Sequence, residues 1–239
     1  MQLLVSVADG REARAALQGG ADVIDAKDPR RGALGPVGPA ALAAIRDAVP
    51  RPHPLSVALG DASEERAIAH AARRAARHGV AFLKVGFAGL AGAARARRLA
   101  TAARWGAGER AELVLVAYAD WRRAASLAPE RVLAVAATVG AHGVLLDTAF
   151  KNAPVFALVS PDAVGAWVTA AHAAGLFAAL AGSLGGADFA TARALGADLV
   201  GVRGAACVGG RTGRVSPSRV AALRALAGAI PPARAAALG

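Results

Sequence analysis

The sequence predicts an α/β protein folded as a single-domain (β/α)8 barrel of the TIM-barrel type. Eight short apolar segments alternate with longer alanine-rich segments along the 239 residues, as strands and helices do in eight βα units. A glycine followed by a small or polar residue and an apolar run recurs where a helix should end and a strand begin. With 55% hydrophobic residues, a chain of this length can bury one large core.

The strands are predicted where apolar residues are concentrated. The first lies at residues 3–7, and the second, at residues 23–27, follows Gly19-Gly20. The Gly-Ala-Asp junction before the second strand recurs closely at residues 196–200, and more loosely before two other strands. The remaining six strands are expected at residues 55–59, 80–85, 113–118, 144–147, 176–181 and 199–203.

Helices are predicted between these strands and after the last one. The first begins after Asp9, whose carboxylate suits a helix N-cap, and covers about residues 10–18. An open doubly wound sheet is the main alternative, but no Gly-x-Gly-x-x-Gly turn follows the first strand. The barrel is assigned to residues 1–228 and a C-terminal tail to residues 229–239. The other helices are expected at residues 39–48, 63–77, 90–105, 129–139, 161–174, 187–195 and 216–226.

The net charge of +11 suggests nucleic-acid binding, because clustered basic residues bind phosphate backbones. The arginines, however, occur singly or in pairs within alanine-rich helices, and aromatic residues make up 4% of the chain. The sequence has neither a long basic run nor an aromatic platform on which bases could stack. We therefore expect no nucleic-acid partner.

Cysteine and apolar patterning indicate a cytoplasmic protein. The single cysteine, Cys207, excludes an internal disulfide framework and a multi-cysteine metal site. The apolar run at residues 3–7 is too short for a signal peptide, and no apolar stretch is long enough to span a membrane. The five histidines lack metal-ligand spacing, so no metal site is predicted. The mean hydropathy of +0.41 is compatible with a homo-oligomer interface.

Lysine is scarce in this chain. Of the 28 basic residues three are lysines, Lys27, Lys84 and Lys151, which leaves 25 arginines. An arginine is effectively always protonated, whereas a lysine amine can lose its proton and attack a carbonyl. The active site of a (β/α)8 barrel lies at the carboxyl ends of the strands. Because all three lysines are predicted at or just after strand ends, we expect them to serve chemistry.

Asp25 and Lys27 are two positions apart, so on a strand they share a face and can both point into the barrel. An ion pair between them that seals the barrel top is the alternative. Lys84 lies in a nearly all-apolar strand, where burial and a second ammonium group lower the pKa of an amine. Two converging lysines are the arrangement expected when one forms a Schiff base and the other moves protons.

Asp147 ends the predicted sixth strand, and Lys151 is close enough in sequence to reach back to it. A purely structural Asp–Lys pair is the alternative to a catalytic role. Asp61, Tyr118 and Asp120 also lie at strand ends, but each could equally cap the following helix. They are second-rank candidates.

Glycine-rich loops follow the predicted seventh and eighth strands, the usual phosphate site of barrel enzymes. Arg203 adds a forked cation suited to phosphate. The alternative is that these glycines merely permit tight turns. The predicted phosphate-binding residues are Gly182, Ser183, Gly201, Arg203 and Gly204.

Several of these segments together resemble the (5-formylfuran-3-yl)methyl phosphate synthase family, also called 4-(hydroxymethyl)-2-furancarboxaldehyde-phosphate synthase, of methanofuran biosynthesis. The most specific are Asp-x-Lys-x-Pro-x-x-Gly-x-Leu-Gly at residues 25–35 and Gly-Val-Arg-Gly-Ala-Ala-Cys at residues 201–207. Phe-Leu-Lys-Val-Gly at 82–86, Leu-Asp-Thr at 146–148 and Ala-Gly-Ser at 181–183 add to the match. Asp28 and Ala33 depart from the familiar asparagine and serine.

The resemblance implies a TIM barrel that condenses two molecules of glyceraldehyde 3-phosphate into a phosphorylated furan aldehyde, releasing phosphate and water without a cofactor. It also implies that Lys27 forms the Schiff base and Lys84 accepts a proton, with Asp25, Asp147 and Lys151 in the same active site. The partner would then be a small phosphorylated triose.

Two alternatives remain at the level of sequence. A different Schiff-base aldolase or dehydratase acting on a sugar phosphate would keep Lys27 and Lys84. A non-catalytic protein that binds phosphate or nucleic acid would tolerate their loss.

Overall fold

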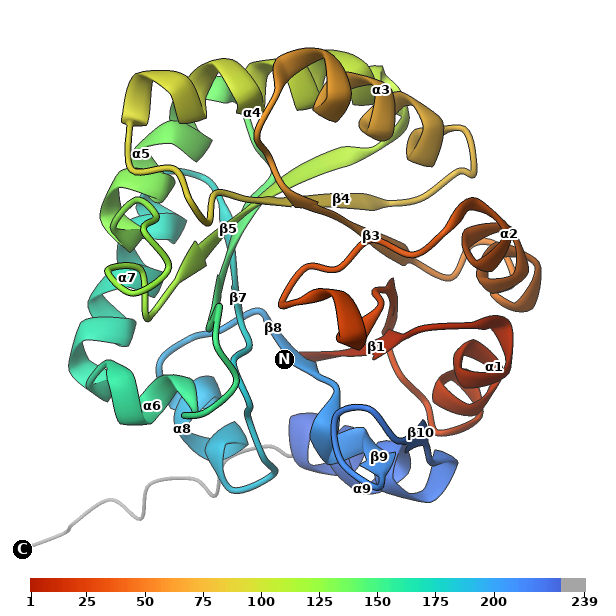
Figure 1. Cartoon of the computed structure of the whole chain (residues 1–239). Coiled ribbons are helices and arrows are strands. Elements are labelled where there is room, and N and C mark those ends of the chain that lie inside the picture. Colours follow the sequence, from red (N-terminus) through yellow and green to blue (C-terminus); the bar gives the residue numbers. More distant parts are fainter. Residues whose placement is uncertain (229–239) are drawn as a thin grey trace, which may run out of the picture.

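The computed structural model describes residues 1–228, which form a closed barrel of parallel strands surrounded by helices (Figure 1). The strands follow one another around the barrel in sequence order, and the eighth pairs with the first to close it. The predicted (β/α)8 fold is therefore confirmed. The barrel strands are β1 (Gln2–Val7), β2 (Val23–Ala26), β3 (Leu55–Asp61), β4 (Phe82–Gly86), β5 (Glu112–Tyr118), β6 (Gly143–Asp147), β7 (Phe177–Leu180) and β8 (Leu199–Val202).

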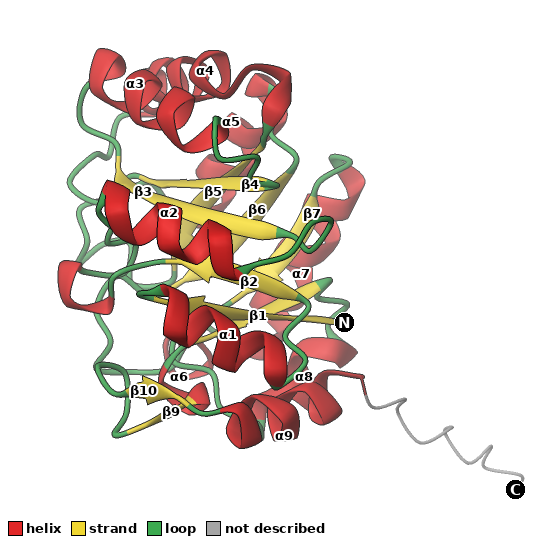
Figure 2. Ribbon diagram, turned by 90° about the vertical axis from the view of Figure 1, so that its right-hand side faces the viewer, coloured by secondary structure: helices red, strands yellow, loops and turns green. Residues whose placement is uncertain are grey.

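The helices lie outside the strands and cover the barrel wall (Figure 2). Three of them have the predicted bounds, α6 was not predicted, and the others differ by a few residues at their ends. The helices are α1 (Gly10–Gln18), α2 (Pro39–Ala48), α3 (Glu65–Ala76), α4 (Ala93–Ala107), α5 (Pro129–Val139), α6 (Val155–Leu158), α7 (Pro161–Ala173), α8 (Asp188–Ala194) and α9 (Pro217–Gly228).

The helix ends have local causes in the sequence. Asp9 caps α1 as predicted, since its Oδ1 accepts the N–H of Glu12 at 2.9 Å. The carboxylate of Glu12 in turn accepts the N–H of Ala8, the residue before the cap, at 2.8 Å. Helix α5 ends at Gly140 with φ 63° and ψ 43°, a left-handed conformation that glycine adopts without strain. Such a glycine lets the chain turn directly into the next strand.

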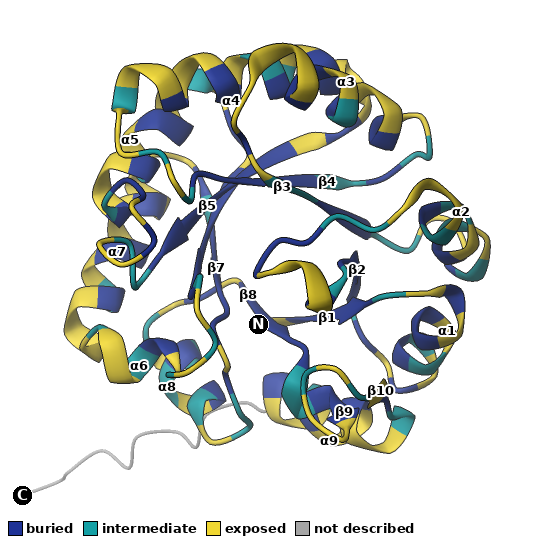
Figure 3. Ribbon diagram, in the orientation of Figure 1, coloured by how far each residue is buried: buried dark blue, intermediate teal, exposed yellow. Residues whose placement is uncertain are grey.

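Figure 3 shows that the barrel strands are buried along most of their length, whereas the helices are exposed on their outer side. The buried residues form two layers, because successive strand residues point to opposite faces. In β1, Leu3 and Val5 belong to the layer shared with the helices, whereas Leu4 belongs to the barrel interior. The ring of Phe82 lies edge-on to that of Phe177, with centroids 5.6 Å apart, where β4 and β7 begin. The interior is therefore closed at the amino end of the strands and can open at the carboxyl end.

Some elements differ from the sequence prediction. Strand β2 ends at Ala26, so Lys27 follows the strand directly. Strand β4 begins at Phe82 and not at residue 80, because the turn after α3 passes through Gly79 with φ 63°. Short elements that the sequence did not predict, besides α6, are η1 (Pro29–Arg31), η2 (Gly108–Arg110), η3 (Gly204–Ala206) and an antiparallel hairpin of β9 (Cys207–Val208) and β10 (Arg214–Val215).

Within residues 1–228, none of the helices combines the length and the apolar character needed to cross a membrane. The tail predicted at residues 229–239 lies outside the described residues.

Candidate active site

Asp25 and Lys84 form a buried ion pair inside the barrel. The Nζ atom of Lys84 lies 2.7 Å from Oδ2 of Asp25, and the two side chains are 4% and 0% exposed. The hydroxyl of Ser6 donates to the same carboxylate oxygen at 2.9 Å. The strand register places Ser6 next to Asp25, because Asp25 of β2 is paired with Ser6 of β1 and with Ser56 of β3. Asp25 thus pairs with Lys84, and the structure contains no Asp25–Lys27 ion pair.

Lys27 stands apart from the other two lysines. Within residues 1–228 its Nζ atom makes no hydrogen bond and no ion pair, although the residue is 8% exposed. Burial lowers the pKa of Lys27 from 10.5 to about 8; Asp147 and Asp25 oppose this shift, while Lys84 and Lys151 add to it. This shift favours the neutral amine of Lys27.

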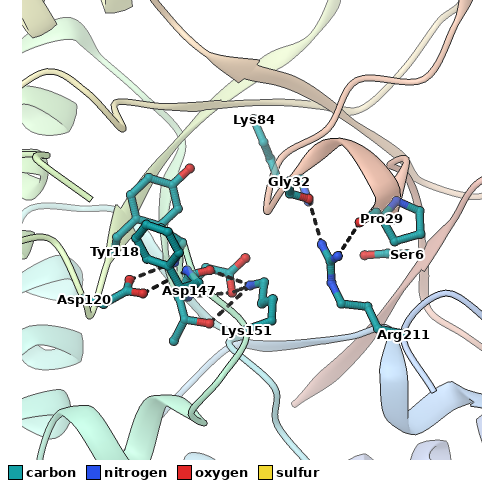
Figure 4. A network of polar contacts seen from close by, with 12 residues as sticks. Ser6, Pro29, Gly32, Lys84, Tyr118, Asp120, Asp147, Lys151 and Arg211 are labelled. Carbon is teal, nitrogen blue, oxygen red and sulfur yellow. Dashed lines mark hydrogen bonds and ion pairs between the residues drawn. The ribbon is translucent and has the colours of Figure 1, made fainter. Parts of the chain in front are cut away.

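Asp147 and Lys151 form the second lysine–carboxylate pair, as the sequence predicted, at 2.6 Å between Nζ and Oδ1 (Figure 4). Lys151 also donates to the carbonyl of Thr148 at 2.6 Å. Burial alone would raise the pKa of Asp147, but the ammonium groups of Lys151 and Lys27 outweigh it, so the pKa is lowered. The other carboxylate oxygen, Oδ2, is buried without a partner among the described residues.

The loop that carries Lys151 is held by Asp120, which follows β5 (Figure 4). The two carboxylate oxygens of Asp120 accept the N–H groups of Ala149 at 2.7 Å and Phe150 at 2.9 Å. Asp120 therefore positions the loop and does not cap the next helix.

Asp61 likewise accepts hydrogen bonds from two neighbouring segments at the carboxyl end of the barrel. Its Oδ1 accepts the hydroxyl of Tyr118 at 2.7 Å and the N–H of Ala88 at 2.8 Å. Burial, followed by the charge of Asp61, raises the pKa of Tyr118. Asp61, at the end of β3, thus joins the loop after β4 to the end of β5, so Asp61 and Tyr118, like Asp120, have a structural contact.

The glycine loops line the same cavity as the lysines, and the loop after β7 adjoins the loop of Lys151, since an added Cβ on Gly182 would lie 3.0 Å from Cγ2 of Thr148. Gly182 and Ser183 have φ values of 95° and 56°, so the chain turns sharply after β7. Within residues 1–228, the N–H groups of Ser183 and Gly204 donate no hydrogen bond. Gly201 faces the interior, where an added Cβ would lie 3.3 Å from Cβ of Ala181. Small residues here leave space for a ligand next to free backbone donors.

Arg203 is committed to other contacts. Its Nε donates to the carbonyl of Arg211 at 3.0 Å, and Nη1 donates to the carbonyl of Ser6 at 3.0 Å and to Glu12. Nη2 donates to Glu12 at 3.0 Å and to the carbonyl of Gly213 at 2.8 Å. These contacts use all five N–H groups of a guanidinium. In this arrangement Arg203 holds loops together and has no N–H group left for a phosphate.

Arg211 is a site residue that the sequence reasoning missed. It lies between β9 and β10, where no element was predicted, and its sequence signal is weak. Its guanidinium donates to the carbonyls of Pro29 and Gly32, in the loop after Lys27 (Figure 4). A buried serine, Ser56, was also missed; it is 1% exposed, and its hydroxyl has no partner among the described residues.

The three lysines, Asp147, the glycine loops and the two arginines line one cavity of about 280 Å³. Its volume is close to that of pockets that hold small ligands. Among residues 1–228, no group of three or more histidine, cysteine or acidic side chains is placed to hold a metal ion. The cavity-lining residues include Lys27, Lys84, Asp147, Lys151, Ser183 and Arg211.

Comparison with known proteins identifies the family. A family model described as 4-HFC-P synthase matches residues 3–224. The chain belongs to the 4-HFC-P synthase family. A Methanopyrus kandleri relative named (5-formylfuran-3-yl)methyl phosphate synthase is 38% identical over 218 residues, covering 89% of this chain and 92% of the relative. A Methanocaldococcus jannaschii relative of the same name is 36% identical over 233 residues, covering 95% and 99%. The resemblance predicted from the sequence is confirmed, and this member of the family is an enzyme.

A solved structure shares the fold of this 4-HFC-P synthase family member. The crystal structure of a 3-hexulose-6-phosphate synthase has a TM-score of 0.61 and 19% sequence identity, and the match covers 95% of this chain and 99% of that chain. At this identity the match bears on the fold alone and supports the (β/α)8 barrel.

Proposed function

We propose that this enzyme condenses two molecules of glyceraldehyde 3-phosphate into (5-formylfuran-3-yl)methyl phosphate, with loss of inorganic phosphate and water, through a Schiff base on Lys27. The names of its relatives support the product. The observation that carries the Schiff-base step is the amine of Lys27, which is buried, unpaired among the described residues and has a pKa of about 8.

In the first step the neutral amine of Lys27 adds to the aldehyde carbon of one triose phosphate. Loss of water then gives an iminium ion, which acidifies the neighbouring C–H group. Burial favours this step twice, since it keeps part of the amine neutral and keeps competing water away.

Removal of that C–H proton requires a base, and Lys84 with Asp25 can supply one. An ammonium group cannot accept a proton until it has passed its own on. Asp25 lies 2.7 Å from Lys84 and can take that proton, so the buried pair can act as one proton-transfer unit. The resulting enamine carbon adds to the aldehyde of the second triose phosphate.

A hydroxyl of the second triose then attacks the iminium carbon, which closes the ring and lets the C–N bond to Lys27 break, and loss of water and of one phosphate gives the aromatic furan. Asp147 and Lys151, 2.6 Å apart, are suited to move protons to and from the departing groups. The free N–H groups of Ser183 and Gly204, with Gly182 and Gly201 next to them, line the same cavity as the lysines, where they would hold a phosphate.

The test is incubation with glyceraldehyde 3-phosphate alone, followed by mass analysis of the product. A parallel sample is reduced with borohydride, and its peptides are mapped. Because the chain has three lysines, the labelled position can be assigned without ambiguity. We expect the furan phosphate as product and a reduced triose adduct on Lys27.

The outcomes separate the alternatives. An adduct on Lys27 without a furan product would point to a different Schiff-base aldolase or dehydratase. An unmodified Lys27 together with furan formation would refute the Schiff base while keeping the reaction. Absence of both would leave a protein that binds phosphate without this chemistry.

A further inference from the structure

The two arginines beside the cavity, Arg203 and Arg211, differ in how many of their N–H groups donate hydrogen bonds. All five N–H groups of Arg203 are used, and its charge is balanced by Glu12. Arg211 donates one N–H from Nη1 to the carbonyl of Pro29 and one from Nη2 to the carbonyl of Gly32, the latter at 2.7 Å. Neither carbonyl carries a charge. Three of the five N–H groups of Arg211 therefore have no partner within residues 1–228.

The charge of Arg211 is also unbalanced by direct contact. Within residues 1–228 no carboxylate forms an ion pair with it, and the side chain is partly buried. Burial lowers the pKa of Arg211 and the charge of Asp147 raises it, yet a guanidinium remains protonated at neutral pH. A partly desolvated cation with spare donors is ready to bind an anion.

Arg211 lies where a substrate anion would arrive. It lines the same cavity as Lys27 and Ser183. Its backbone packs against the loop after β8, since an ideal Cβ on Gly204 would lie 3.7 Å from the backbone nitrogen of Arg211. From there the side chain crosses the cavity mouth to the loop after β2 (Figure 4). The guanidinium therefore joins the glycine loops to the loop that follows Lys27.

We infer that Arg211, rather than Arg203, is the cation that binds the phosphate group of the substrate, a phosphate monoester. This inference rests on the proposed function and deepens it by naming the residue that selects phosphorylated trioses. The fork of a guanidinium can make two parallel hydrogen bonds to phosphate oxygens. Because Arg211 also holds the carbonyls of Pro29 and Gly32, a bound phosphate would steady the loop beside Lys27.

Binding of glycerol 3-phosphate tests the inference directly, because this ester carries the phosphate but has no aldehyde to react. Affinities are measured by calorimetry for the wild type, Arg211→Gln and Arg211→Lys. The matched control is Arg214→Gln, an exposed arginine of the same hairpin. We expect Arg211→Gln to weaken binding by about 10- to 100-fold, since a hydrogen bond to a charged group contributes roughly 1.5–3 kcal/mol. Arg211→Lys should lie between, and Arg214→Gln should match the wild type.

Equal affinities of the wild type and Arg211→Gln, or no binding by the wild type, would overturn the inference. A second measurement separates phosphate binding from support of the loop. Borohydride trapping on Lys27 is compared between glyceraldehyde 3-phosphate and unphosphorylated glyceraldehyde. If Arg211 binds phosphate, Arg211→Gln slows trapping of the phosphorylated aldehyde alone. An equal loss with both aldehydes would mean that Arg211 only holds the loop.

The proposed reaction can fail without this inference failing. Loss of glycerol 3-phosphate binding in Arg211→Gln, together with no furan from glyceraldehyde 3-phosphate, would support the phosphate site and refute the proposed product.

Discussion

Two parts of the cavity mouth differ in whether their charged and polar groups have partners. On the side of β4 and β6, Lys84 and Lys151 each contact a buried carboxylate at 2.7 Å or less. On the side of β7 and β8, the loops offer backbone N–H groups, and Arg211 has no carboxylate partner within residues 1–228. Lys27, after β2, lines the same cavity, and its Nζ atom makes no ion pair or hydrogen bond within residues 1–228.

The difference separates proton transfer from anion binding. A lysine held against a carboxylate has a defined route for a proton, whereas unpaired donors keep their hydrogen bonds available for a ligand. The arrangement lowers the stability of the folded protein at Lys27, because a buried amine without a partner is unfavourable in its protonated form. The following predictions test this division.

Replacement of Lys27 should have the largest effect. Lys27→Arg keeps the positive charge but cannot form a Schiff base, so we expect kcat to fall on the order of 10³-fold or more. Furan formation is followed with glyceraldehyde 3-phosphate, and binding of glycerol 3-phosphate by Lys27→Arg serves as the control. Full activity in this variant would show that the carbonyl is not attacked by Lys27.

The buried pair of Asp25 and Lys84 should matter for both activity and stability. Lys84→Met leaves the Asp25 carboxylate buried and unpaired, which should lower the free energy of unfolding by about 3–5 kcal/mol. The double variant Asp25→Asn with Lys84→Met should recover most of this stability, while activity stays down on the order of 10²-fold or more. Denaturant unfolding and kcat are measured together. Recovery of activity in the double variant would show that the pair is structural only.

Lys27 should be costly to stability at neutral pH. Its folded-state pKa of about 8 lies below 10.5, so below pH 8 both states are protonated and the full penalty of the buried ammonium is present. As pH rises from about 8 toward 10.5, the folded state loses its proton first and the wild type gains stability. At 1.36 kcal/mol per pKa unit, Lys27→Met should be more stable by at most about 3 kcal/mol at pH 7.

This advantage of Lys27→Met should shrink as pH approaches 10. Denaturant unfolding at pH 7 and pH 10 measures this difference in stability. Lys84→Met is the control, because it is expected to be less stable than the wild type. An advantage that does not change with pH would mean that the amine of Lys27 is not the source of the cost.

The sequence predicted the fold and the lysine side of the site for the same reason. Apolar periodicity and glycine junctions locate the strands, and strand ends place Asp25, Lys84 and Asp147 at one edge. What could not be predicted depends on contacts between distant segments. Arg203 meets Glu12 across 191 positions, and Arg211 reaches Gly32 across 179. Spacing along the chain says nothing of which arginine is saturated and which keeps free donors.

The smallest effect is expected from Asp120, which holds the loop of Lys151 through two backbone N–H groups. Asp120→Ala should lower kcat about tenfold, because the loop can then move Lys151 away from Asp147. Asp120→Asn keeps one accepting oxygen and should fall between, while Asp162→Ala on the exposed start of α7 is the control.

A pH profile distinguishes this positioning role from general destabilisation. The ammonium of Lys151 lowers the pKa of Asp147, so a loosened loop should raise that pKa. Asp147 would then become protonated at a higher pH, and the acid limb of the kcat profile should move upward in Asp120→Ala. A lower kcat with an unmoved acid limb would contradict the link from Asp120 through Lys151 to Asp147. Because the two N–H contacts lie on the backbone, the link depends on the shape of the loop and not on any direct contact between Asp120 and the reacting atoms.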